Sequence, residues 1–155
     1  SMFLHLTGVK FKVGKKISAN KFFNQCVNKR LSKDDFEMSE DGTTELKLRI
    51  LPMLFCKNLK ATMICDMNEN RPLLVTDKLI GGVKGCLGFK KDESNFYVPN
   101  TTLNSDIRDF NSETQRIIAT YTKEKTDEKY SNQVYVANNI NLNNMKLPEK
   151  LKQLI

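Results

Sequence analysis

The chain's single histidine, His5, is the side chain best suited to acid–base chemistry, and it lies in the segment Phe3-Leu4-His5-Leu6-Thr7-Gly8. An imidazole with a pKa of about 6.5 both accepts and releases a proton at neutral pH, which is why metal-free cleavage of phosphodiesters often uses one. A half-buried histidine that is hydrogen-bonded to a carbonyl at the end of a strand gives the same pattern. The pattern by itself favours this structural interpretation.

Two further groups of residues contain cations that can bind a phosphate. In the first group, Arg71-Pro72 and Thr76-Asp77-Lys78 lead into a glycine-rich stretch. Lysine supplies a point charge to a phosphate and arginine a bidentate fork. A solvated hairpin at Asp77 and Lys78 explains the same residues more simply.

The second group is Tyr97-Val98-Pro99-Asn100-Thr101, followed by Arg108. Tyr97 offers a stacking surface or a hydroxyl, and Asn100 and Thr101 offer hydrogen bonds. Arg108 can hold a phosphate or stabilise the charge of a transition state. A strand end followed by a turn explains these residues equally well.

Basic and aromatic side chains also interleave further along the chain, which suits a surface for single-stranded nucleic acid. These residues are Arg116, Tyr121, Lys123, Lys125, Lys129 and Tyr130. Most charged segments are only solvated, so this pattern is weaker evidence than the two groups above.

Composition limits the class of protein. The 155 residues have the length of one hydrophobic core, so we expect residues 2–155 to form a single domain. The net charge of +7 favours a polyanionic partner such as nucleic acid, although many basic proteins only gain solubility from it. No apolar run approaches the roughly 20 residues that cross a bilayer, and no leader is recognisable. We therefore expect no membrane association and a cytoplasmic location.

Motifs for metals and nucleotide cofactors are missing from the sequence. One histidine excludes an H-E-x-x-H site and a three-histidine zinc site. The cysteines form no C-x-x-C pair and lie among apolar neighbours, as reduced core thiols do; they are Cys26, Cys56, Cys65 and Cys86. If the chain is an enzyme, we expect it to use neither a metal nor a cofactor.

Helices are expected before strands along the chain. Ser18 is a typical N-cap for a helix from Ala19 onward, and Ser32 is a typical N-cap for a short turn through residues 34–36. Residues 44–57 fit a strand or a helix. We favour a helix that is capped by Thr43 or Thr44 and kinked at Pro52.

The second half of the sequence has the short apolar runs of strands. The expected strands cover residues 61–67, 72–76, 79–89, 96–98, 116–122 and 133–137. Residues 79–89 alternate glycine with apolar residues, which suits a close backbone approach or a bulged strand more than a helix. The pattern predicts an α+β fold, with N-terminal helices packed on one face of a mainly antiparallel sheet of four to five strands.

Several short motifs resemble a family of small proteins from phages and mobile elements. The motifs are Phe3-Leu4-His5-Leu6-Thr7-Gly8, Asp41-Gly42-Thr43-Thr44, Arg71-Pro72, Thr76-Asp77-Lys78-Leu79, Cys86-Leu87-Gly88-Phe89 and Tyr97-Val98-Pro99-Asn100-Thr101. The family has the barnase–EndoU–colicin–RelE-like nuclease fold, also called the BECR fold. The resemblance extends from His5 to about Tyr130 and implies a metal-independent ribonuclease site on the sheet.

The resemblance and the residue patterns together give the candidate site. The candidate catalytic residues are His5, Lys78, Tyr97, Thr101 and Arg108. The candidates for binding nucleic acid are Thr7, Arg71, Asn100, Arg116, Lys123 and Tyr130. RNA is the expected partner, and an immunity protein or a host protein is a second kind of partner that the resemblance allows.

The expected mechanism uses one imidazole. His5 acts as general base on the ribose 2′-hydroxyl or as general acid on the leaving oxygen. The other proton moves through Lys78, Tyr97, a threonine hydroxyl or water. The alternative is a non-catalytic module that binds RNA or protein on the same scaffold, such as a phage-encoded inhibitor of a host enzyme or defence complex.

Overall fold

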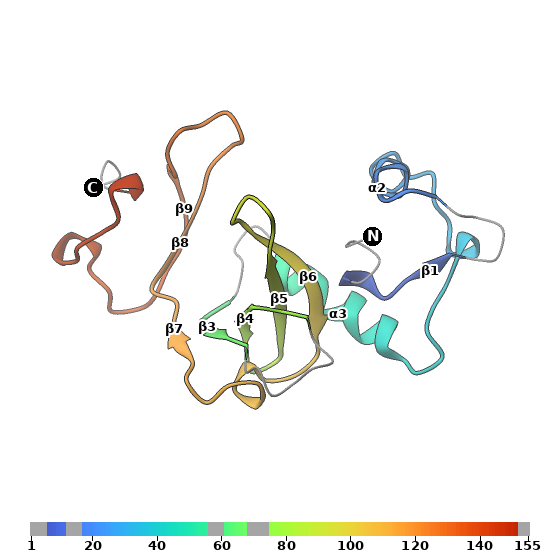
Figure 1. The fold of residues 1–155 in the computed structure, drawn as a ribbon, viewed down its shortest axis with the longest axis horizontal. Coiled ribbons are helices and arrows are strands. Elements are labelled where there is room, and N and C mark those ends of the chain that lie inside the picture. Colours follow the sequence, from blue (N-terminus) through green and yellow to red (C-terminus); the bar gives the residue numbers. More distant parts are fainter. Residues whose placement is uncertain (1–5, 12–16, 56–60, 68–74, 152–155) are drawn as a thin grey trace.

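The computed structural model describes residues 6–11, 17–55, 61–67 and 75–151. Figure 1 shows three parts side by side: the N-terminal helices, a five-stranded sheet in the middle, and a two-stranded hairpin with the C-terminal segment. No helix of the described residues is long and apolar enough to cross a membrane. The α+β class predicted from the sequence is confirmed.

The N-terminal part begins with a short strand pair, β1 (Lys10–Phe11) and β2 (Phe36–Glu37), and with helix α2 (Ala19–Val27). The Ser18 side chain accepts a hydrogen bond from the Lys21 N–H, so the predicted N-cap is confirmed. Phe22 of α2 is buried and meets Phe11 edge to face at 5.2 Å. The 3₁₀ turn η1 (Lys33–Asp35) has the predicted Ser32 cap, completed by the Asp35 carboxylate.

Helix α3 (Thr43–Phe55) confirms the helical interpretation of this segment and contains Pro52. The predicted cap was wrong, because the helix begins at Thr43 and the Asp41 carboxylate accepts the Thr43 N–H at 3.0 Å. Thr44 is fully buried, and its hydroxyl donates to the Gly8 carbonyl at 2.8 Å. This bond ties α3 to the segment that follows the N-terminus.

The five-stranded sheet is antiparallel throughout, in the order β6-β5-β4-β3-β7. Its strands are β3 (Met63–Asp66), β4 (Lys78–Gly82), β5 (Gly85–Lys91), β6 (Tyr97–Leu103) and β7 (Gln115–Arg116). Residues 79–89 form two strands, the β4–β5 hairpin with Val83 and Lys84 in its turn, where the sequence suggested one. The predicted bulge is present in β5, where the register against β6 shifts between Gly88 and Phe89. A side chain at Gly81 would lie 2.4 Å from the Gly85 carbonyl oxygen, so the hairpin requires glycine there.

Two other strand predictions differ from the structure. The run predicted for residues 116–122 is divided, because β7 pairs with β3, whereas β8 (Ala119–Thr122) pairs with β9 (Asn132–Val136) as a separate hairpin. Of the strand predicted for residues 72–76, only residues 75 and 76 are described, and they belong to no strand. The remaining 3₁₀ turns are η2 (Ile107–Asp109), η3 (Leu142–Asn144) and η4 (Glu149–Leu151).

The sheet has two differently covered faces. On the α3 face, Leu87 packs with Ile50 and Leu54 of α3 and with Leu6, and Ile80 and Phe89 extend this cluster. On the η2 face, the buried side chains are Cys65, Leu79, Cys86, Ile107 and Phe110. Helix α3 is thus the helix that lies on the sheet, whereas α2 lies beyond α3, beside β1 (Figure 1).

Candidate functional site

The motif Thr76-Asp77-Lys78 is fixed by three different strands. The Thr76 hydroxyl donates to the Asn100 side-chain oxygen of β6 at 3.3 Å. The Asp77 carboxylate accepts the Lys91 N–H of β5 at 2.7 Å. The Lys78 ammonium forms an ion pair with Asp66 of β3. The residues at the start of β4 are therefore bonded to β3, β5 and β6, and the Lys78 side chain has a defined position.

Lys78 belongs to a small cluster at one end of the sheet. We use the name Lys78 cluster for Asp66, Lys78, Lys91 and Tyr97. The Lys78 Nζ lies 5.6 Å from the centroid of the Tyr97 ring, and the Lys91 Nζ lies 5.9 Å from it. Both distances allow cation–π attraction. The structure thus brings together two of the predicted catalytic residues, Lys78 and Tyr97.

The cluster lies on the α3 face. Lys78 is paired in register with Phe89 and with Asp66, and Tyr97 is paired with Lys91. Paired residues of an antiparallel sheet point to the same side, and alternate residues of a strand share a face. Phe89 packs with the α3 face cluster, so the Lys78 cluster continues that face beyond the area that α3 covers.

The ion pair sets the chemical state of Lys78. The hydrogen bond to Asp66 raises the pKa of Lys78, and this effect outweighs partial burial, which lowers it. The ammonium therefore keeps its proton at neutral pH. It can stabilise negative charge on a phosphate, but it cannot serve as a base that removes a proton.

A pocket of about 300 Å³ adjoins the cluster. It is lined by Ile64, Cys65, Asp66, Lys78, Asn111, Glu113, Thr114 and Gln115. The Asn111 side-chain NH₂ donates to the Asp66 carbonyl at 2.9 Å, and its side-chain oxygen accepts the Glu113 N–H at 2.8 Å. These bonds fix the segment 111–113, which lines one side of the pocket, against β3. This volume is at the lower end of the range for small-ligand sites.

The predicted residues near the N-terminus are placed only in part. His5 and Arg71 lie outside the described residues. Thr7 is 7% exposed, and its hydroxyl accepts the Val9 N–H at 3.3 Å. Leu6 is buried on the α3 face with Leu87. The segment that follows His5 therefore reaches the face on which Lys78 lies. It does so in a helical turn at Leu6 and Thr7, where the sequence suggested a strand end.

Asn100 and Thr101 do not join the Lys78 cluster directly. The Asn100 amide donates to the Val75 carbonyl at 2.6 Å and accepts the Thr76 hydroxyl, so it holds the segment that leads to Lys78. Thr101 is paired with Gly88, and its methyl group is 2.6 Å from where a Gly88 Cβ would lie. Gly88 is paired with Leu79, so Thr101 faces the η2 side of the sheet.

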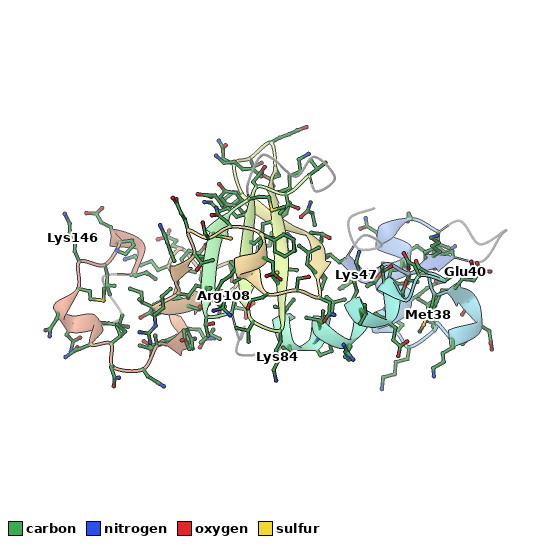
Figure 2. All side chains as sticks on the ribbon, turned by 90° about the horizontal axis from the view of Figure 1, so that it is seen from below. Met38, Glu40, Lys47, Lys84, Arg108 and Lys146 are labelled. Carbon is green, nitrogen blue, oxygen red and sulfur yellow. The ribbon has the colours of Figure 1, made fainter. Side chains whose placement is uncertain are left out.

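Arg108 lies on the η2 side as well. Its Nη2 is 2.6 Å from an Asp106 oxygen, and its Nε donates to the same carboxylate at 3.0 Å. This pairing lowers the pKa of Asp106 and raises that of Arg108. Figure 2 shows Arg108 beside the sheet, and Lys84 at the β4–β5 turn, which is the end of β4 opposite to Lys78. The structure does not bring Arg108 together with Lys78.

The last predicted residues lie apart from the Lys78 cluster. Arg116 of β7 donates to the Asn138 carbonyl at 3.1 Å. The Lys123 Nζ lies 5.6 Å from the centroid of the Tyr130 ring at the end of the β8–β9 hairpin. Figure 1 shows this hairpin extending away from the five-stranded sheet. Asn100 supports the cluster, whereas Arg116, Lys123 and Tyr130 belong to other surfaces.

Sequence reasoning missed Asp66 and Lys91. Asp66 is the last residue of β3, and Lys91 is the last residue of β5. Each meets the cluster through strand pairing, which depends on register between distant segments. In the part of the chain that the structure describes, no three histidine, cysteine or acidic side chains gather so that they could hold a metal ion.

Comparison with known families gives one match. The model of the family described as phage-Barnase-EndoU-ColicinE5/D-RelE like nuclease 4 matches residues 1–139. This range contains the whole sheet, the Lys78 cluster and the β8–β9 hairpin. Comparison with curated proteins and with solved structures gives no match.

Proposed function

Because the chain belongs to the family of phage-Barnase-EndoU-ColicinE5/D-RelE like nucleases 4, we propose that it is a metal-independent ribonuclease with its site at the Lys78 cluster. One observation carries this proposal: the Lys78 ammonium is fixed by Asp66 at the surface and lies over the Tyr97 ring. A fixed cation beside an exposed aromatic ring offers charge for a phosphate and a stacking surface for a base.

RNA supplies its own nucleophile for this reaction. The 2′-oxygen attacks the adjacent phosphorus, the bond from phosphorus to the 5′-oxygen breaks, and a 2′,3′-cyclic phosphate and a 5′-hydroxyl result. One proton leaves the 2′-hydroxyl and one is added to the 5′-oxygen. Lys78 stabilises the charge that grows on the phosphate oxygens, since its raised pKa keeps it protonated.

One of the two proton transfers needs a group that titrates near neutral pH, while the other proton moves through water, Lys78, Tyr97 or a threonine hydroxyl. We assign the first of these transfers to His5. It is the chain's single histidine. The next residue, Leu6, packs on the α3 face, which is the face of the Lys78 cluster. Arg71 is assigned to the RNA backbone, because its segment leads into the Thr76-Asp77-Lys78 motif. Arg108 has no part in this arrangement, since it lies on the η2 side with Asp106.

The direct test is incubation of the purified protein with labelled RNA in EDTA. We expect cleavage, with 2′,3′-cyclic phosphate ends in the mass spectrum of the products. The matched substrate carries 2′-deoxyribose at the cleaved nucleotide, which removes the nucleophile, and it should stay intact. Salt-sensitive binding of RNA without any cleavage would contradict the proposal and favour a non-catalytic binding module.

A second test addresses His5. We expect His5→Ala to lower RNA cleavage at least about tenfold, because general acid–base catalysis contributes about 10²- to 10⁴-fold. The melting temperature should stay nearly unchanged. Thermal unfolding and initial cleavage rates are measured on the same preparation. A large loss of stability with intact activity would show that His5 has a structural role.

A further inference from the structure

The excess positive charge of the chain lies in its first 33 residues. Residues 1–33 contain eight lysines and arginines and no aspartate or glutamate, whereas residues 34–155 contain 17 of the former and 18 of the latter. The net charge of +7 is therefore not a property of the five-stranded sheet that carries the Lys78 cluster. Charge of one sign that is concentrated in one part of a molecule is typical of a surface that binds a polyanion.

Helix α2 carries part of this charge on one polar side. Lys21, Asn24, Gln25 and the C-cap residue Asn28 are spaced i, i+3, i+4 and i+7, so they lie along one side of the helix. Together with Arg30 they line a pocket of about 310 Å³. All five lining side chains offer N–H donors, and none carries a negative charge. The pocket is therefore suited to an anion.

The cations at this end of α2 are not neutralised by the protein. Among the described residues, Lys21, Lys29 and Arg30 form no ion pair. Lys10 differs from them, because its partner in the β1–β2 pair is Glu37. The three cations of α2 and its C-terminal turn can therefore bind an external anion without first releasing a carboxylate.

The backbone at Lys29 gives a second indication. Lys29 directly follows the C-cap Asn28 and adopts a left-handed conformation, with a φ of 53°. Glycine is the usual residue at this position of a helix end, because it has no Cβ to be strained there. A lysine is thus present where glycine would fit the backbone better, and its positive charge gives a functional reason for this residue type.

We propose that α2 forms a second surface for nucleic acid, on which Lys21, Lys29 and Arg30 bind the phosphate backbone. This inference rests on the proposed ribonuclease function and adds a place where the substrate is held apart from the Lys78 cluster. Seen from the five-stranded sheet, α2 lies beyond α3 (Figure 1), so the two surfaces bind different phosphates of one nucleic acid.

The donors on α2 predict how this surface recognises its ligand. Cations and carboxamides both donate to phosphate oxygens, and contacts to phosphates carry no sequence information. Binding at α2 should therefore depend little on base sequence and should accept ribose and deoxyribose alike. It should also weaken steeply with salt, because each neutralised phosphate releases counterions. Cleavage at the Lys78 cluster, in contrast, requires the ribose 2′-hydroxyl.

The test compares Lys21→Gln/Arg30→Gln with Lys84→Gln/Lys146→Gln. Both double variants remove two positive charges, and Figure 2 shows Lys84 and Lys146 on parts of the molecule away from α2. Fluorescence anisotropy with a labelled 2′-deoxy oligonucleotide measures binding without cleavage. The α2 variant should bind about tenfold more weakly at low salt, and its plot of log affinity against log salt should be shallower by about 1.5. The control should lose less than about twofold. Unchanged affinity of the α2 variant, or an equal loss in the control, would overturn the inference.

Lys29→Gly separates binding from folding. It removes a charge and also the strain of a left-handed lysine, so the melting temperature should stay the same or rise while oligonucleotide affinity falls about fourfold. Unchanged affinity would contradict the role of Lys29. Poly-glutamate is the second ligand, and binding as tight as that of the oligonucleotide would overturn the inference in favour of an acidic protein partner.

The cleavage assay separates this inference from the proposed function. A dinucleotide reaches one surface at a time, so Lys21→Gln/Arg30→Gln should raise KM for long RNA and leave kcat and the KM for a dinucleotide unchanged. If the α2 variant loses oligonucleotide binding but the natural protein never cleaves RNA, the α2 surface stands and the ribonuclease assignment fails. If both double variants cleave long RNA with the KM of the natural protein, the ribonuclease assignment stands and the α2 surface fails.

Discussion

Lys78 and Leu79 are consecutive residues of β4, but their side chains point to opposite faces of the sheet and lie in different environments. Leu79 is fully buried in the η2 face cluster with Ile107. Lys78 lies at the surface of the α3 face, paired with Asp66. At this end of β4, the alternation of side chains along one strand therefore places a buried packing residue next to a surface residue that a substrate can reach.

The two faces also treat ionisable groups differently. On the η2 face, burial raises the pKa of the Cys86 thiol to about 12 and keeps it uncharged. On the α3 face, the hydrogen bond to Asp66 raises the pKa of Lys78 and keeps it charged. One shift results from excluded water and the other from a fixed opposite charge. A buried neutral group contributes to packing, whereas a fixed surface charge is available to a phosphate.

The largest expected effect concerns the η2 face. Leu79→Ala removes a fully buried side chain and leaves a cavity, so we expect the free energy of unfolding to fall by about 2–5 kcal/mol. Urea denaturation measures this loss. The cleavage rate per folded molecule should not change, because Leu79 faces away from the Lys78 cluster. A lost cleavage rate with an intact fold would show that the two faces are not independent.

The next effect concerns the α3 face. Lys78→Met keeps the aliphatic stem but removes the charge, and we expect kcat/KM for RNA to fall about 10²-fold. The free energy of unfolding should change by less than about 1 kcal/mol, because exposed ion pairs contribute little.

Lys84→Met is the matched control for Lys78→Met, since it removes a charge at the other end of β4 and should leave cleavage unchanged. Kinetics and urea denaturation are measured for both variants. If Lys78→Met lost as much stability as Leu79→Ala and still cleaved RNA normally, Lys78 would have a structural role and no role in cleavage.

Local signals in the sequence predicted the N-terminal elements. Ser18 and Ser32 cap their helical turns through hydrogen bonds to residues two or three positions away, so the pattern alone is sufficient. The β4–β5 turn gave no such signal. Val83 and Lys84 do not have the positive φ that marks the usual two-residue hairpin turns, and glycines flank the turn rather than occupy it.

The sequence predicts those residues of the site whose chemical type alone suggests a role. Lys78 and Tyr97 could be selected because a cation and an aromatic ring suit a nucleotide, and the structure places them together. Asp66 could not be selected, because its contact with Lys78 requires the register of β3 against β4. Thr101 lies on the other side of the sheet because of its pairing with Gly88, and Arg108 belongs to the η2 turn, which packs on that side through Ile107. Short motifs encode neither placement.

A smaller effect should appear in the pH dependence of stability. The folded state keeps the Cys86 proton up to about pH 12, whereas the unfolded chain releases it near the ordinary value of 9.0. The folded state binds more protons above pH 9, so stability falls as the pH rises from about 9 to about 12. Between pH 8 and 10 this contribution is about 1 kcal/mol.

Cys86→Ala isolates this contribution from the other groups that titrate at high pH. Urea denaturation of both proteins from pH 7 to 10 should show a steeper decline for the natural protein. Parallel curves would mean that the Cys86 thiol is more accessible to water than the η2 face cluster indicates.

The smallest effect is expected for substitution of Arg108, and this variant tests whether RNA contacts only the α3 face. Arg108 is exposed and paired with Asp106 on the η2 side, so Arg108→Ala should change the free energy of unfolding by less than about 1 kcal/mol and cleavage by less than about twofold. RNA that stays on the α3 face cannot reach it. If Arg108→Ala lowers cleavage as strongly as Lys78→Met, the bound RNA must also contact the η2 side of the sheet. The η2 side would then contribute to RNA binding as well as to the hydrophobic core.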